Sequence, residues 1–282
     1  MIETLIYSLI AGVAVGFAAG YLGSLMVLEK MALVGDAMSH VALPGLALGV
    51  IFGFNPLLGG FVFLFISALL TWQLKRSTEL SFETIVGTAF TLALAIGILL
   101  YGDRLDALEA ALFGDITKVT LTYALFSVLT AVIVVFLTHL IYNKVVLTLI
   151  SEELAKSKAI NTDAINLLFL LLVSVIVAIG IQVTGTLLVG FLVVTPAAAA
   201  RIISSNMSKY RNLSAVFGTV SAISGILLSV TLNILPGPLI VISGVAIFVI
   251  MLVYSKVNKM ESKEPKIRKD VSSSQSMHQN AD

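Results

Sequence analysis

The sequence predicts an all-α integral membrane protein, a bundle of about nine (eight to nine) transmembrane helices. Three observations support this fold class. The 282 residues are 58% hydrophobic and 12% charged, with a mean hydropathy of +1.05, far above what one soluble core requires. The apolar residues form continuous runs long enough to cross a bilayer core of ~30 Å, which takes ~20 helical residues. The runs lack the alternation of apolar and polar residues that marks membrane β-strands.

Nine runs meet the length requirement. In chain order they cover residues 5–28, 31–54, 56–74, 82–101, 119–142, 164–183, 186–204, 213–232 and 239–254. The first has no basic region before it and no small-residue cleavage site, so we expect it to be retained and not removed as a signal peptide. A polar stretch at 151–158 predicts a short helix outside the bilayer. The predicted domains are a transmembrane domain at 1–255 and a polar, basic, disordered cytoplasmic tail at 256–282.

The distribution of Lys and Arg predicts the orientation. Nine crossings place the two ends of the chain on opposite sides of the membrane. If the tail is cytoplasmic, 15 of the 17 basic residues lie inside and only Arg104 and Lys118 lie outside. The expected location is therefore the plasma or inner membrane, with the N-terminus outside and the C-terminus in the cytoplasm.

The residue types exclude several kinds of chemistry. The chain has no cysteine, which rules out disulfides, thiolate metal sites and cysteine nucleophiles. It has no G-x-x-x-x-G-K-[ST] loop, H-E-x-x-H motif or dinucleotide fingerprint. We therefore expect no enzyme, and ATP hydrolysis would need a separate subunit. A net charge of +1 gives no support for nucleic-acid binding.

The second run holds the residues best suited to bind a ligand. Asp36 and His40 are ionisable groups within an otherwise apolar segment, where each costs a few kcal/mol. Residues four apart share a helical face, and counting ~1.5 Å per residue from Lys30 places them ~9 and ~15 Å deep. Pro44 and Gly45 favour a kink or an unwound turn, which would free backbone carbonyls. Carboxylate and imidazole suit manganese, iron or zinc; a purely structural Asp–His hydrogen bond is the alternative.

Glu83 is the candidate third ligand. It lies at the inner end of the fourth run, on the same side of the membrane as Asp36. An acid that caps a helix N-terminus is an equally good interpretation. Glu79 is expected to be a surface acid, His139 an interfacial or core histidine, and His278 a tail residue.

Two further features of the sequence are an acidic loop and two polar interruptions of apolar runs. The predicted outer loop, 102–118, carries four acidic residues and either docks a basic partner, concentrates cations or is simply solvated; these residues are Asp103, Asp106, Glu109 and Asp115. Thr184-Gly185-Thr186 and Thr195-Pro196 interrupt two apolar runs, which indicates close helix packing or a gate.

Four segments resemble one known family. Residues 29–45, Glu-Lys-Met-Ala-Leu-Val-Gly-Asp-Ala-Met-Ser-His-Val-Ala-Leu-Pro-Gly, resemble the signature of the permease subunits of ABC importers for manganese, zinc and iron. Phe82-Glu-Thr-Ile-Val-Gly87, Leu112-Phe-Gly-Asp115 and the stretch 187–201, which ends in Thr-Pro-Ala-Ala-Ala-Ala-Arg, resemble later segments of that family in the same order. The resemblance covers roughly residues 5–255.

The resemblance implies a permease homodimer that moves a divalent metal inward by alternating access. It also implies two cytoplasmic ATPase subunits and an extracellular or periplasmic metal-binding protein that docks at the outer acidic loop. Asp36 and His40 match the intramembrane metal site of the family, and Glu83 matches an acid near it. The coupling helix to the ATPase would comprise Glu152, Glu153, Leu154, Ala155 and Lys156.

The expected cargo is a divalent metal, and two other functions remain as alternatives. No cofactor is expected to be resident, and the transported metal would be manganese, zinc or iron. The stretch Ser-His-x-x-Leu-Pro-Gly resembles the manganese and iron branch of the family more than the zinc branch, and oxygen-rich ligation would suit manganese. An ATPase-independent secondary metal transporter or channel and a non-transporting membrane scaffold are the alternative hypotheses.

Overall fold

The computed structural model describes residues 2–114 and 119–261, and within these ranges the chain forms helices and no strands. The helices are α1 (Ile2–Leu28), α2 (Ala32–Phe52), α3 (Pro56–Ser77), α4 (Phe82–Tyr101), α5 (Leu105–Phe113), α6 (Leu121–Ile150), α7 (Glu152–Ser157), α8 (Thr162–Thr184), α9 (Val189–Ile203), α10 (Met207–Leu232) and α11 (Pro236–Glu261). The all-α prediction is confirmed.

The number of membrane-spanning helices agrees with the predicted eight to nine. Eight of the described helices are long and apolar enough to cross a bilayer, and α9 is a shorter apolar helix of 15 residues. At 1.5 Å per residue α9 is only ~22 Å long. It is shorter than the predicted run because residues 186–188 form a turn before it begins.

Other elements also differ from the predicted ones. α10 begins at Met207, before the predicted start at 213. α6 continues to Ile150 instead of ending at 142, because Asn143 and Lys144 are followed by further apolar residues that suit a helix. α11 continues past 255 to Glu261, while residues 262–282 of the predicted tail lie outside the described part. Within the outer connection, residues 105–113 form α5, where only a loop was expected.

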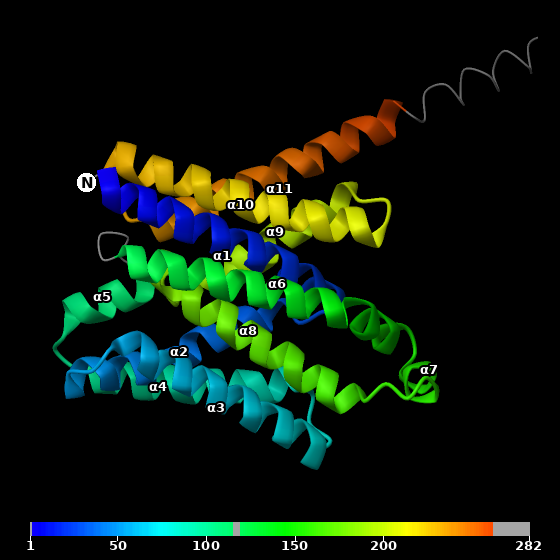
Figure 1. Ribbon diagram of the computed structural model, residues 1–282, viewed down its shortest axis with the longest axis horizontal. Helices are drawn as coiled ribbons and strands as arrows, with labels where there is room; N and C mark the ends of the chain where they lie inside the picture. Colours follow the sequence, from blue (N-terminus) through cyan, green and yellow to red (C-terminus); the bar gives the residue numbers. More distant parts are fainter. Residues whose placement is uncertain (1, 115–118, 262–282) are drawn as a thin grey trace, which may run out of the picture.

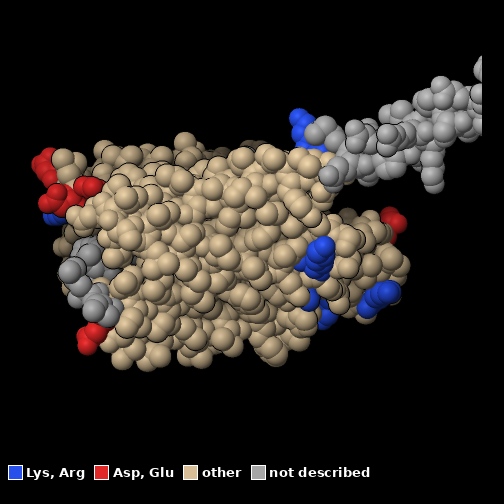
Figure 2. Space-filling model, turned by 90° about the horizontal axis from the view of Figure 1, so that it is seen from above, with Lys and Arg blue, Asp and Glu red and all other residues tan. Residues whose placement is uncertain are grey.

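The long helices lie side by side along the long axis of the molecule (Figure 1), with α5 at one end of the bundle and α7 at the other. Acidic side chains gather at the α5 end and basic ones at the α7 end, and the surface between them carries almost no charge (Figure 2). This belt exposes large apolar side chains, among them Leu99 and Phe52. Such a surface is typical of contact with lipid hydrocarbon.

Small residues allow the inner helices to approach closely. The backbones of α1 and α10 touch where Gly16 meets Gly218 and where Gly20 meets Ser214, and a Cβ on any of these glycines would overlap a backbone carbonyl of the other helix. Lipid provides little hydrophobic drive between helices, so such close packing is a main source of cohesion. Of the eight long helices, α2 is the most buried.

Candidate metal site in the second helix

Asp36 and His40 lie one turn apart near the start of α2. His40 is buried, with 6% of its surface exposed, and Asp36 is half-buried. Counted from Ala32 at 1.5 Å per residue, they lie ~6 and ~12 Å along a helix of ~31 Å. His40 is therefore close to the middle of α2. The buried atoms Asp36 Oδ1 and His40 Nδ1 are enclosed by the bundle and are not on its outer surface.

The two side chains have unused bonding capacity. Asp36 Oδ1 and His40 Nδ1 are both buried and have no hydrogen-bond partner among the described residues. An unsatisfied buried polar atom costs ~1–3 kcal/mol. The structural alternative requires an Asp–His hydrogen bond that satisfies these atoms, and neither Asp36 Oδ1 nor His40 Nδ1 makes one among the described residues. Both atoms are acceptable donors to a divalent transition metal.

Three contacts fix the position of the pair. The Ser39 hydroxyl donates a hydrogen bond of 2.6 Å to the Asp36 carbonyl oxygen. The His40 ring meets the Phe90 ring of α4 edge-on, with centroids 5.1 Å apart. The backbone of Asp36 packs so closely on Gly190 of α9 that a Cβ on Gly190 would overlap it. α2, α4 and α9 therefore enclose the site.

Pro44 affects His40 directly. A proline has no amide hydrogen, so Pro44 cannot donate to the carbonyl four residues earlier, which belongs to His40. One more oxygen at the level of the imidazole is thus left without its usual helical partner. The predicted unwound turn is wrong, because α2 runs without interruption from Ala32 to Phe52 with Pro44 inside it. The adjoining Gly45 packs directly on Gly59 of α3, which holds the helix together beyond the proline.

Glu83 does not join the pair in this conformation. No group of three or more His, Cys, Asp or Glu residues suited to hold a metal forms in the described part of the chain. Glu83 is exposed in the first turn of α4, next to the N-cap Ser81, whose hydroxyl accepts from the Thr84 amide. The seven residues from Glu83 to Phe90 correspond to ~10 Å of helix, so Glu83 lies about two turns toward the basic end from the level of His40.

The other histidines and the outer loop are placed as follows. The Nδ1 atom of His139, in α6, lies 2.9 Å from the hydroxyl oxygen of Tyr21, in a hydrogen bond that joins α6 to α1. His278, Asp115 and Lys118 lie outside the described residues. The end of α5 packs on the interruption around Gly185. There the Thr186 amide donates to the Ala111 carbonyl, and the Leu187 amide donates to the Leu112 carbonyl. Close packing therefore explains the break.

The segment predicted to couple to an ATPase forms α7. Ser151 caps this helix by accepting from the Leu154 amide, and Lys156 forms an ion pair of 2.7 Å with Glu152. The hydrogen bond and charge of Glu152 raise the pKa of Lys156 above its usual value. Ala155 is fully buried, whereas the other residues named for this helix are exposed: Glu152, Glu153, Leu154 and Lys156. α7 thus offers a polar, accessible surface at the basic end.

The sequence analysis did not predict two groups of contacts between residues distant in the chain. Arg211 of α10 lies over the rings of Tyr21 and Tyr142, 5.2 and 4.9 Å from their centroids. At the basic end the Trp72 indole donates to the Asp163 carbonyl, and Arg76 pairs with the Asp163 carboxylate at 3.4 Å. The partners are about 70 to 190 positions apart, and no local pattern signals such pairs.

Comparison with known proteins identifies the family. Residues 1–255 match the model of the ABC 3 transport family. The chain is 30% identical over 250 residues to the manganese transport system membrane protein MntC of Listeria monocytogenes, covering 88% of this chain and 89% of that protein. It is 28% identical over 256 residues to the high-affinity zinc uptake system membrane protein ZnuB of Haemophilus influenzae, covering 89% and 98%.

A solved structure agrees with this assignment. The structure described as PsaBC from Streptococcus pneumoniae in complex with Fab superposes with a TM-score of 0.78 at 28% identity, covering 88% of this chain and 91% of that chain. Family model, sequence relatives and fold therefore point the same way. The chain belongs to the ABC 3 transport family.

Proposed function

We propose that this chain is the transmembrane permease subunit of an ATP-driven importer for a divalent transition metal, with manganese as the first candidate cargo and zinc as the second. The observation that carries the proposal is the buried pair Asp36 and His40, whose Oδ1 and Nδ1 atoms lack partners near the middle of a bundle of membrane-spanning helices. A divalent cation would satisfy both atoms and offset the cost of burying the carboxylate.

The metal identity rests on the ligands and the relatives. Oxygen-rich ligation suits manganese, and relatives named as manganese transport proteins stand beside relatives named for zinc uptake. The carboxylate of Asp36 and the freed carbonyl of His40 supply oxygen, and the imidazole supplies one nitrogen. Glu83 is proposed as a third ligand only in a conformation in which the inner end of α4 moves toward Asp36.

The proposed orientation places the basic end in the cytoplasm. The positive-inside tendency favours the cytoplasm for the end that carries α7 and the end of α11, and the outside for the N-terminus and α5. In this orientation α7 meets an ATPase subunit, and the acidic surface around α5 meets a metal-binding protein. Two copies of the chain would form the pathway, alternately open to either side.

The deciding experiment is metal uptake into proteoliposomes that contain the full chain together with its ATPase. Uptake of manganese is expected to require ATP and to fall roughly tenfold or more in Asp36→Ala and in His40→Ala, because removing a metal-site residue weakens binding at least this much. Glu79→Gln is the control for Glu83→Gln, since both acids are exposed at the same end.

Three results would decide against parts of the proposal. Uptake driven by an ion gradient without ATP would establish the alternative, a secondary metal transporter or channel. Normal ATP-driven uptake by a well-folded double variant of Asp36 and His40 would reject the site while leaving the permease role intact. Equal uptake by Glu83→Gln and Glu79→Gln would remove Glu83 from the ligand set.

A further inference from the structure

A long groove runs between α1, α6 and α10, and none of its lining residues belongs to α2. Its volume is about 870 Å³ and its walls are almost wholly apolar, formed by residues such as Val13, Phe17, Val132 and Phe136. Val132 and Phe136 are 61% and 60% exposed, so the groove is open along the side of the bundle. In a membrane this side faces hydrocarbon.

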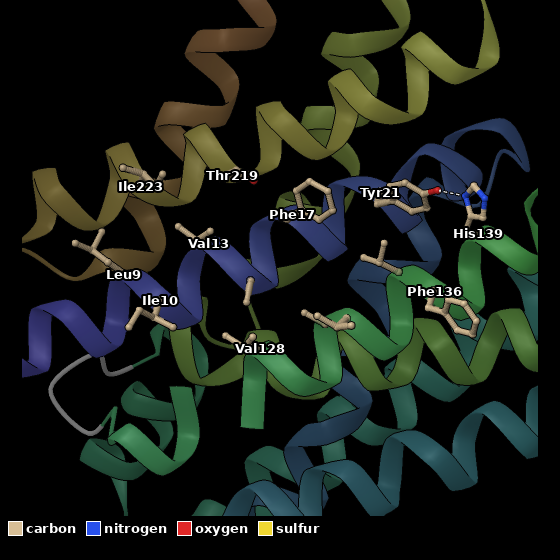
Figure 3. A pocket seen from close by; sticks show the side chains of 14 residues that line it. Leu9, Ile10, Val13, Phe17, Tyr21, Val128, Phe136, His139, Thr219 and Ile223 are labelled. Carbon is tan, nitrogen blue, oxygen red and sulfur yellow. Dashed lines mark hydrogen bonds between the residues drawn. The ribbon is translucent and has the colours of Figure 1, made fainter. Parts of the chain in front are cut away.

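The length of the groove matches that of one acyl chain. Along α1 it extends from Leu9 to Tyr21, which corresponds to ~18 Å. An acyl chain covers half of a ~30 Å hydrocarbon core, or ~15 Å. Figure 3 shows Leu9 and Ile223 toward one end and the hydrogen-bonded Tyr21 and His139 at the other. The groove is therefore apolar along most of its length and polar only at the end formed by Tyr21 and His139.

The polar end carries a cation that lacks a counter-ion. The Arg211 guanidinium lies over Tyr21, which lines the groove, and over Tyr142 behind it. No carboxylate pairs with Arg211 in the described ranges, and its buried Nε atom has no hydrogen-bond partner there. Stacking on two aromatic rings holds the guanidinium in place but leaves its donors and charge unsatisfied. Arg211 lies near the start of α10, at the basic end of the molecule.

We propose that this groove binds one acyl chain of an anionic phospholipid from the leaflet at the basic end, with the lipid phosphate on Arg211. The apolar walls select hydrocarbon, the length suits one acyl chain, and the unpaired guanidinium selects a negatively charged head group. The site is separate from Asp36 and His40 and does not depend on the metal.

The test uses the full chain in nanodiscs that contain phosphatidylcholine with a small fraction of phosphatidylglycerol carrying a photoreactive acyl chain. Cross-linking is expected on peptides of α1, α6 and α10. Arg211→Gln is expected to lower the cross-linked fraction about fivefold, as the loss of ~1 kcal/mol for one basic residue implies, and Arg211→Lys is expected to restore most of it. Lys209→Gln removes an exposed charge from the same helix and should change nothing.

A second pair of variants tests the groove itself. Val132→Trp fills the groove and is expected to reduce cross-linking, whereas Leu129→Trp, at an equally exposed position of α6 that does not line the groove, is the matched control. Equal labelling by photoreactive phosphatidylcholine would overturn the proposal. Conversion of a dimer to a monomer by Val132→Trp would also overturn it, because the groove would then be a contact between copies of the chain. Loss of ATPase binding in Arg211→Gln would overturn it as well, because Arg211 would then contact a protein and not a lipid.

Discussion

The backbones of Gly45 in α2 and Gly59 in α3 are in direct contact, and a Cβ atom on either residue would overlap the carbonyl oxygen of the other. Gly45 lies on the helix that carries Asp36 and His40, just beyond Pro44. The contact therefore sets the position of the candidate ligands relative to α3. Glycine is needed on both sides, because a Cβ on either residue would prevent α2 and α3 from approaching this closely.

Gly45→Ala is expected to lower the free energy of unfolding by ~1–3 kcal/mol, the usual cost of forcing an extra methyl group into a packed interface. Thermal unfolding of the detergent-solubilised chain measures this change. Gly87→Ala in α4 is the control, because a Cβ there would meet no atom within 4 Å, and alanine is the better helix former. Equal losses in the two variants would show that the α2–α3 contact does not matter.

Substitution of the metal-site pair is expected to separate stability from transport. Asp36→Asn and His40→Leu should abolish metal uptake without lowering the unfolding temperature. The first removes the charge of a half-buried carboxylate, and the second removes a buried nitrogen that has no partner among the described residues. Ser243→Ala is the control: its buried hydroxyl donates to the Leu239 carbonyl within α11, and its loss should cost ~1 kcal/mol or less and leave uptake intact. Instability in proportion to lost uptake would instead support the scaffold hypothesis.

Gly185→Ala is expected to detach α5. Gly185 has φ of 78°, and a Cβ there would overlap the backbone of Leu112 at the end of α5. Gly53, with φ of 72°, has nothing within 4 Å of the same position. The backbone cost differs between the two alanine variants: it is ~1–2 kcal/mol for Gly53, which is left-handed with ψ of 22°, and ~1–3 kcal/mol for Gly185, whose ψ of 167° lies in a region that essentially only glycine adopts. Faster proteolysis within residues 105–113 in Gly185→Ala, and not in Gly53→Ala, therefore isolates the contact. Equal losses and equal proteolysis would contradict it.

Glu29, between α1 and α2, is expected to make stability depend on pH. Burial raises its pKa from the usual 4.5 to about 7. A carboxyl with a raised pKa favours the folded state when protonated, so stability is highest below pH 4.5 and falls as the pH rises toward 7. Glu29→Gln should flatten this part of a plot of unfolding temperature against pH. Glu79→Gln, at an exposed acid, should leave the slope as it is.

Most of the fold could be predicted from the sequence because the bilayer imposes a length on each apolar run. Where helices leave the bilayer, hydropathy no longer marks their ends. For this reason the extensions of α6 to Ile150 and of α11 to Glu261, and the existence of α5, were not predicted. The start of α9 depends on hydrogen bonds from Thr186 and Leu187 to the distant α5, which no local pattern encodes.

Of the candidate metal site, only the part that lies on α2 could be predicted from the sequence. The spacing of Asp36 and His40 within α2 was sufficient to place them on one face. Phe90 of α4 carries no recognisable signal, and Gly190 of α9, although it lies in the family-like stretch 187–201, gave no indication that it meets Asp36. Of the kink or unwound turn expected at Pro44, the unwound turn does not form, because α2 continues through the proline to Phe52. A third ligand from this chain is not present beside the pair in the described residues.

The contact between α2 and α9 has a mechanical consequence. Gly35 and Asp36 meet Gly190 through the backbone, so no interlocked side chains lie between the two helices at the level of the ligands. A smooth interface of this kind offers little resistance to sliding, in contrast to ridges seated in grooves. In the proposed transport cycle, a sliding movement of α2 along α9 would therefore meet the least side-chain resistance at Gly190, directly beside Asp36.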